Sequence, residues 1–155
     1  MKIEYEYTFG IPRNLVWKYI KDENVLRNSL PGCKSFVESS NGVYVAEIEI
    51  HLGPIKDLLT LEVRREKEKS PTFYQLAMKG KGKLGEVEGV AELFIEDLHG
   101  TSKLTFSGDV QVTGKIAMVG KRILESGANK SLGKFFETVE SEIKKIIHQV
   151  KRSGR

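Results

Sequence analysis

The sequence predicts an α+β fold in which a curved antiparallel sheet of seven strands packs around one long C-terminal helix. Apolar residues recur at steps of three and four along residues 114–150, which is the period of an amphipathic helix. Between residues 33 and 112, apolar and polar residues alternate instead, which is the period of strands with one buried face. We therefore expect one domain at residues 1–150 and a basic C-terminal tail at residues 151–155.

The N-terminal segment predicts one strand followed by two short helices. Residues 2–9 alternate strictly between polar and apolar side chains, as a half-buried strand does. Gly10 ends this strand, and Pro12 suits the first turn of the first helix. Asp22 is suited to cap the second helix, because its carboxylate can accept hydrogen bonds from the free backbone N–H groups there.

The alternating segment contains five clear strand patterns, separated by turn signals such as Ser40-Asn41-Gly42 and Gly53-Pro54. In each pattern one face is apolar and the other polar, which is typical of an antiparallel sheet that is wet on one side. The positions expected to face the helix are Tyr44, Ala46, Ile48 and Ile50; Leu59, Leu61 and Val63; Tyr74, Leu76 and Met78; Val87, Ala91, Leu93 and Ile95; and Leu104, Phe106, Val110 and Val112.

The predicted C-terminal helix is longer than the body it packs against. As one straight helix, residues 114–150 would extend roughly 50 Å, which is more than the width of a small domain. The helix therefore either runs across the whole molecule and projects past it, or bends. Glycine weakens a helix interior, so Gly127 and Gly133 are the expected positions of a bend.

Charge is distributed unevenly along the chain. The net charge is +4, but residues 113–155 hold 10 Lys or Arg and 4 Asp or Glu. This basic end is either a solvated helix face or a surface that lies against an anionic membrane. Nucleic-acid binding is disfavoured, because no aromatic side chains are interleaved with the basic ones. The basic residues at the helix end are Lys144, Lys145, Lys151, Arg152 and Arg155.

The single cysteine, Cys33, excludes an internal disulfide and a cysteine-rich metal site. The N-terminus does not resemble a signal peptide, and no run approaches the roughly 18 apolar residues that span a bilayer. We expect a soluble cytoplasmic protein whose basic end could contact the inner face of the cytoplasmic membrane.

No catalytic or metal site is expected. His51, His99 and His148 fall in separate elements, and nothing in the pattern brings them together. Metal ligation needs His, Cys, Asp or Glu at short, defined spacings, which the sequence lacks. The glycine series at residues 80–85 matches a dinucleotide-binding motif by letter, but a strand follows it where that motif requires a helix. We therefore expect no catalytic residues, no metal ligands and no cofactor.

Small inward-facing residues, namely Ala46, Gly89, Ala91 and Gly108, point to a cavity between sheet and helix. The alternative is that these glycines only let the sheet coil. An apolar cavity of this kind binds hydrophobic small molecules. The residues expected to contact such a ligand are Tyr44, Ile48, Leu61, Tyr74, Met78, Ala91, Leu93, Phe106, Val110, Met118, Ile123 and Phe135.

Several segments also carry a family resemblance. They are Pro12 with Trp17, Leu30-Pro31-Gly32-Cys33, Gly53-Pro54-Ile55-Lys56, Lys79-Gly80-Lys81-Gly82, and Asp109 to Ala117. In this order and spacing they resemble the carbon monoxide dehydrogenase G-subunit family, which belongs to the START-like, polyketide-cyclase-like superfamily. The resemblance covers about residues 1–150.

The resemblance implies a helix-grip (START-like) fold and a non-catalytic accessory protein. Family members are associated with molybdenum-containing carbon monoxide dehydrogenases and related hydroxylases. They are implicated in placing the enzyme at the membrane, and in binding a lipid or quinone so that electrons can reach the respiratory chain. The sequence departs from the common family pattern at Asp57 and Thr113, where glycine is frequent, and it stops at Arg155 without the hydrophobic extension of some members.

Two other functions stay open. A START-like cyclase or hydratase would need polar groups inside the cavity, and the hydroxyls of Tyr44 and Tyr74 are the only obvious ones at the expected inward positions. An assembly or chaperone-like module would instead have a filled core and no ligand.

Overall fold

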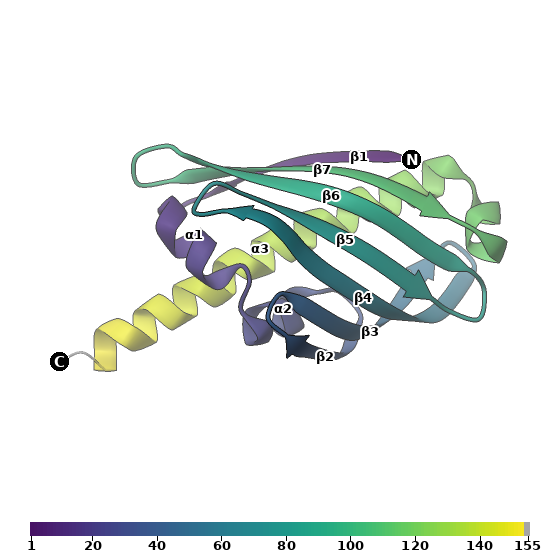
Figure 1. The fold of residues 1–155 in the computed structure, drawn as a ribbon, viewed down its shortest axis with the longest axis horizontal. Helices are drawn as coiled ribbons and strands as arrows, with labels where there is room; N and C mark the ends of the chain where they lie inside the picture. The colour runs from purple at the N-terminus through teal and green to yellow at the C-terminus, as the bar shows by residue number, and fades with distance from the viewer. Residues whose placement is uncertain (154–155) are drawn as a thin grey trace.

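The computed structural model describes residues 1–153 and shows a seven-stranded sheet with one long helix behind it (Figure 1). All neighbouring strands are antiparallel, and the order across the sheet is β1-β7-β6-β5-β4-β3-β2. The elements are β1 (Lys2–Phe9), α1 (Arg13–Tyr19), α2 (Glu23–Ser29), β2 (Cys33–Ser40), β3 (Val43–Leu52), β4 (Ile55–Lys69), β5 (Phe73–Lys81), β6 (Glu86–Asp97), β7 (Ser102–Val112), the 3-10 helix η1 (Gly114–Val119) and α3 (Lys121–Ser153). The α+β helix-grip prediction is confirmed.

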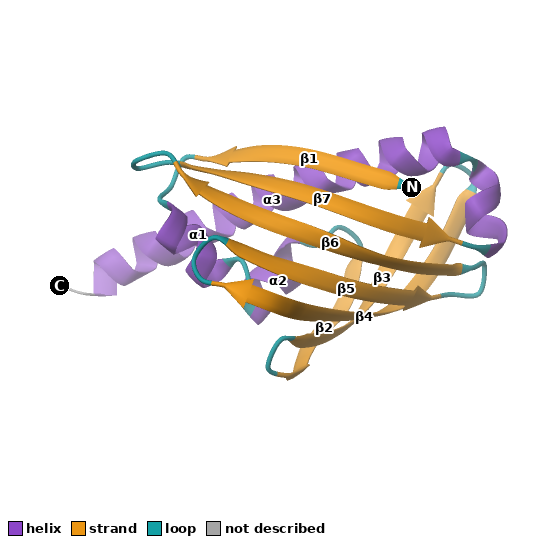
Figure 2. Ribbon diagram, turned by 45° about the horizontal axis from the view of Figure 1, so that its top comes forward, coloured by secondary structure: helices purple, strands orange, loops and turns teal. Residues whose placement is uncertain are grey.

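Hairpins connect most strands of the sheet, and the two short helices connect its two edges. Strands β2 to β7 follow one another as hairpins, while β1 pairs with β7, from Lys2 opposite Asp109 to Phe9 opposite Ser102. The two short helices α1 and α2 therefore carry the chain from one edge strand to the other (Figure 2). Because the apolar positions of every strand fall on one face, the sheet bends toward that face and encloses α3.

The start of α2 follows the predicted capping chemistry. The carboxylate of Asp22 accepts hydrogen bonds from the backbone N–H groups of Asn24 at 2.9 Å and Val25 at 3.0 Å. These bonds satisfy two donors that have no partner within the helix. The predicted N-cap is confirmed.

The long C-terminal helix begins later than predicted. The expected stretch from residue 114 is split at Gly120, whose φ of +97° interrupts the chain between η1 and α3. Beyond this corner, α3 runs as one helix for 33 residues that include Gly127 and Gly133. Both glycines are points of close approach. A Cβ at Gly127 would lie 2.9 Å from Leu52 Cδ2, and one at Gly133 would lie 2.7 Å from the Tyr5 hydroxyl oxygen.

The expected basic tail is largely part of this helix. Residues 151–153 are helical, and Arg155 lies outside the described residues. Within residues 1–153, the helices are all too short or too polar to cross a membrane.

Candidate functional site

The concave face of the sheet, which faces α3, divides into two halves that differ in how well they are covered. One half, which we call the closed half, lies under α1 and the middle of α3. Its side chains pack against Phe136, Val139 and Ile143 of α3 and are at most 4% exposed. The strand residues of the closed half are Phe9, Tyr74, Leu93, Ile95 and Leu104.

The other half, which we call the open half, is only partly covered. Its apolar side chains share the inward face with the closed half, yet each stays partly exposed. The segment of α3 at this end, residues 121–130, has no fully buried side chain. The residues of the open half are Leu61, Met78, Val87, Ala91 and Val110. Two of them lie at its margins, since Ala91 also packs against the closed half and Leu61 packs against a second buried cluster. An apolar surface that the protein leaves partly exposed on its own concave side is suited to a hydrophobic molecule.

Inward glycines do not by themselves create this space. At Gly108, an added Cβ would lie 3.1 Å from the ring of Phe106, and at Gly80 it would collide with the side chain of Leu61. At Gly89 it would lie 2.7 Å from the backbone oxygen of Asp109. These glycines therefore accept neighbouring groups, which agrees with the alternative interpretation of close packing in a coiled sheet.

Five of the twelve predicted ligand contacts meet on the partly covered surface. Leu61, Met78, Ala91 and Val110 belong to the open half, and Phe106 lies beside Ala91 on the neighbouring strand. Strand pairing places them together, since Met78 lies opposite Gly89, which in turn lies opposite Val110.

Another five predicted contacts are core residues or lie beside the core. Tyr44 and Ile48 are buried in a second cluster with Phe36 and Ala46. Tyr74 and Leu93 are buried in the closed half. Phe135 is partly buried on α3, with its ring centroid 5.1 Å from that of Phe136.

The last two predicted contacts lie at the end of the molecule. Met118 on η1 is 82% exposed and Ile123 at the start of α3 is 42% exposed, so neither side chain lines the concave face in this structure. The two residues lie on either side of the corner at Gly120, which separates η1 from α3.

Sequence reasoning missed a polar group on the concave side. Arg65 donates a hydrogen bond to the hydroxyl of Tyr44, and its Nε lies 2.8 Å from the carboxylate of Glu68. Tyr44 in turn donates to the backbone oxygen of Lys21 at 2.9 Å, and the ammonium of Lys21 lies 4.0 Å from the Trp17 ring centroid. The expectation that only tyrosines would be polar at inward positions is therefore wrong. Arg65 continues the alternation two residues after an inward valine, and that phase could have revealed it.

The hydroxyls on the concave side are suited to hydrogen bonding that stabilises the fold and not to acid–base chemistry. Burial raises the pKa of Tyr44, although the neighbouring Arg65 opposes the shift. Burial also raises the pKa of Tyr74 well above its ordinary value. Both hydroxyls are therefore neutral near pH 7 and can donate hydrogen bonds, but they are poor general bases.

Asp57, which departs from the common pattern of the resembled family, has a structural role near the open half. Its carboxylate accepts hydrogen bonds from the backbone N–H groups of Leu58 at 2.8 Å, Leu84 at 2.9 Å and Lys83 at 3.3 Å. Led by the Leu84 bond, these interactions lower the pKa of Asp57 below its ordinary value. The carboxylate thus ties the start of β4 to the β5–β6 hairpin.

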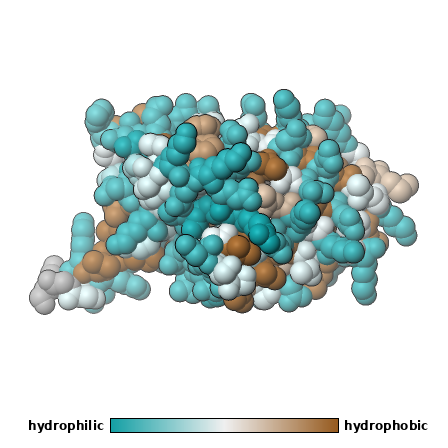
Figure 3. All heavy atoms as spheres, in the orientation of Figure 1, coloured by the Kyte–Doolittle hydropathy of each residue, from teal (hydrophilic) through white to brown (hydrophobic). Residues whose placement is uncertain are grey.

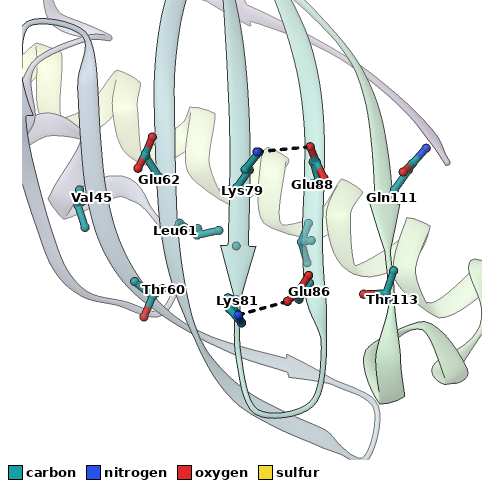
Figure 4. Close-up of a pocket in the computed structure, with 12 residues that line it drawn as sticks. Val45, Thr60, Leu61, Glu62, Lys79, Lys81, Glu86, Glu88, Gln111 and Thr113 are labelled. Carbon is teal, nitrogen blue, oxygen red and sulfur yellow. Dashed lines mark ion pairs between the residues drawn. The ribbon is translucent and has the colours of Figure 1, made fainter.

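A recess of about 330 Å³ lies mainly on the outer face of the sheet. Figure 4 shows Glu62, Lys79, Glu88 and Gln111 side by side across four strands, with α3 behind the sheet. Lys79 pairs with Glu88 at 4.0 Å, and both side chains are well exposed. Hydrophilic residues also cover most of this face in the space-filling view (Figure 3). A surface of paired, solvated charges does not suit a hydrophobic ligand.

The histidines do not form a site. His51 Nε2 lies 2.9 Å from the carboxylate of Glu49 at the surface, and His99 occupies a tight turn. Across residues 1–153, no three side chains among His, Cys, Asp and Glu are placed to hold a metal ion together.

Comparison with known proteins gives a family and a fold. Residues 7–144 match the model of a family described as the G-subunit of carbon monoxide dehydrogenase (CoxG). Among curated proteins there is no match.

Solved structures share the fold across almost the whole chain. A conserved protein from Geobacillus kaustophilus has a TM-score of 0.89 and 24% identity over 94% of this chain and 96% of that one. A START superfamily protein from Mycobacterium smegmatis has a TM-score of 0.70 and 11% identity over 94% and 98%. The Zhui aromatase/cyclase from Streptomyces sp. R1128 has a TM-score of 0.68 and 14% identity over 95% of each chain.

Proposed function

This chain belongs to the carbon monoxide dehydrogenase G-subunit (CoxG) family, and from that premise we propose that it is a non-catalytic protein that binds a lipid or a quinone. The observation that carries the proposal is the open half, where Leu61, Met78, Ala91 and Val110 form an apolar surface that α3 leaves partly exposed. Burying this surface against an apolar ligand would be favourable at about 25 cal/mol per Å².

The family membership supports a partner of a defined kind. We propose that the protein serves a molybdenum-containing carbon monoxide dehydrogenase or a related hydroxylase. Its role would be to hold the enzyme at the inner face of the cytoplasmic membrane, or to carry a quinone that accepts the enzyme's electrons. A ligand site formed by apolar side chains is consistent with a carrier, since it binds the molecule without reacting with it.

The test is ligand binding with a matched pair of variants on one strand. The purified protein is extracted with organic solvent for mass spectrometry, and it is then titrated with a short-chain quinone and with a phospholipid. Ala91→Phe fills the open half, whereas Val90→Phe adds the same ring to the outer face, where Val90 is 43% exposed. We expect saturable binding that Ala91→Phe weakens at least about tenfold and Val90→Phe leaves unchanged. Absence of saturable binding, or equal binding by both variants, would overturn the proposal.

A second candidate is a cyclase or hydratase, favoured by the hydrogen-bonded pair of Arg65 and Tyr44 and by the buried hydroxyl of Tyr74 on the concave side. Such an enzyme would convert the ligand that the extraction identifies. We expect the ligand to be recovered unchanged after incubation with the protein. A new product that disappears in Tyr74→Phe, with ligand affinity retained, would favour the enzyme instead.

A further inference from the structure

The end of the molecule next to the open half presents an exposed apolar tip. We define the Met118 tip as η1, the corner at Gly120 and the first turn of α3 as far as Ile123. Met118 and Ile123 are 82% and 42% exposed, and light-brown spheres mark this end in the hydropathy view (Figure 3). Their exposure does not come from a loose segment. Ile116 of the same 3-10 helix is 1% exposed, and its N–H donates to the Leu84 backbone oxygen at 3.1 Å.

Cations surround these apolar side chains. Lys115, Lys121 and Arg122 are exposed on the Met118 tip itself, and Lys83 is exposed on the β5–β6 hairpin that η1 contacts. Glu125, the acidic residue nearest in sequence, lies 3.7 Å from Lys121 and is paired with it. The tip therefore combines exposed apolar side chains with an excess of positive charge.

We propose that the Met118 tip docks on an anionic lipid bilayer. Met118 and Ile123 enter the boundary between headgroups and acyl chains, while Lys115, Lys121 and Arg122 lie against lipid phosphates. The proposal rests on the proposed function and deepens it, because it names the surface through which a lipid or quinone would reach the open half.

The position of the tip supports both roles, docking on a bilayer and passage of a ligand to the open half. A Cβ on Gly85, beside η1, would lie 3.3 Å from Ile116, and Gly85 stands two residues before Val87 of the open half. Ile123 approaches the β3–β4 turn, since its Cδ1 lies 4.0 Å from where a Cβ on Gly53 would be. A bilayer that contacts the Met118 tip is thus next to the partly covered apolar surface.

The composition of the tip favours lipid over other partners. Two exposed apolar side chains cover far less than the roughly 800 Å² that each partner contributes to a stable protein interface. The tip carries no aromatic side chain on which a nucleic-acid base could stack. A few apolar side chains among cations match the chemistry of an anionic membrane surface.

The tip is also separate from the basic helix end that the sequence suggested as a membrane contact. Figure 1 shows η1 at one end of the long axis and the C-terminal end of α3 at the other. A bilayer facing the Met118 tip therefore does not contact Lys151 and Arg152 at the same time. This separation provides a matched control, since the same charge change can be made at either end.

The experiment is flotation of the full chain with vesicles of phosphatidylcholine alone or with 30% phosphatidylglycerol. We expect binding to the anionic vesicles that falls with added salt, and that drops at least about fivefold in Met118→Asp and in the double variant Lys115→Glu/Arg122→Glu. Lys151→Glu/Arg152→Glu should bind as the wild type does. Thermal unfolding of each variant verifies the fold, which these exposed positions should not alter.

Several outcomes overturn the docking proposal. They are absence of vesicle binding by the wild type, unchanged binding by the tip variants, and loss of binding in Lys151→Glu/Arg152→Glu. A tip that captures a purified hydroxylase but no vesicles would also overturn it, in favour of a protein partner.

Quinone titration without vesicles keeps the two proposals distinguishable. Vesicle binding without quinone binding would contradict only the proposal that the protein binds a quinone. Quinone binding without vesicle binding would contradict only the proposal that the Met118 tip docks on a bilayer.

Discussion

Tyr7 donates a 2.7 Å hydrogen bond to Glu140 and so joins β1 to α3 across 133 residues of sequence. The same carboxylate accepts from the backbone N–H of Gly10 at 3.1 Å and pairs with Lys144 at 3.0 Å. Glu140 therefore fixes α3 to the sheet beside the closed half. Between Lys121 and Lys130, at the other end, no side chain of the helix is fully buried.

Removing this hydrogen bond should weaken the attachment of α3. We expect Tyr7→Phe to lower the free energy of unfolding by about 1–2 kcal/mol, because it leaves one oxygen of a partly buried carboxylate without its donor. Chemical denaturation measures this change. Tyr19→Phe is a suitable control, because the Tyr19 hydroxyl has no such partner among the described hydrogen bonds. Equal effects of the two substitutions would contradict the assignment.

Stability should also depend on the protonation of Glu140. Burial alone would raise the pKa of this carboxyl, but hydrogen bonds from Tyr7, Lys144 and Gly10 outweigh burial and hold the pKa below its ordinary value. The stabilisation is therefore complete above the unfolded-state pKa of about 4.3 and is lost as the pH falls through the folded-state pKa. We expect Glu140→Gln to unfold at lower denaturant than the wild type at pH 7, with the difference shrinking toward pH 3.

The two glycines in α3 should respond in opposite directions to alanine. Alanine is favoured over glycine in a helix by about 1 kcal/mol. At Gly127 the new Cβ meets the flexible end of the Leu52 side chain at the end of β3, which can move, so Gly127→Ala should raise the free energy of unfolding. At Gly133 it meets the Tyr5 hydroxyl, and the Tyr5 ring stacks on Phe136 and cannot move freely, so Gly133→Ala should lower it. Thermal unfolding of the two variants decides the matter, and a change of the same sign in both would refute the argument.

The inward arginine and its outward neighbour provide another matched pair. Arg65→Met should cost about 1–3 kcal/mol, because it breaks the bonds to Tyr44 and Glu68 on the concave side. Arg64→Met removes only a surface pair with Glu62 and should change stability by less than about 0.5 kcal/mol. Urea unfolding of both variants gives the comparison. A larger loss in Arg64→Met would mean that the inward network contributes little.

Periodicity made most of the fold predictable. Alternation in the strands requires only that one face be buried, and it correctly placed residues such as Ile3 and Leu104 in the core. The cap at Asp22 was predictable because it depends on four consecutive residues.

Features that depend on distant contacts or on backbone handedness were less accessible. Gly120 stands in an otherwise helical pattern, and only its positive φ reveals a corner. Arg65 follows the inward alternation, but its partners Tyr44 and Glu68 come from β3 and from the far end of β4. The division of the concave face into closed and open halves depends on how α3 crosses the sheet, which no local pattern encodes.

The attachment at Glu140 fixes α3 to the sheet beside the closed half, so a small rotation about this point would move the start of the helix the most. The arm from Glu140 back to Lys121 is roughly 29 Å long at 1.5 Å per residue. A rotation of about 5° at Glu140 would therefore displace the start of the helix by roughly 2.5 Å. Such a rotation would widen entry to the apolar surface at one end of the helix while leaving the packed core at the other end intact.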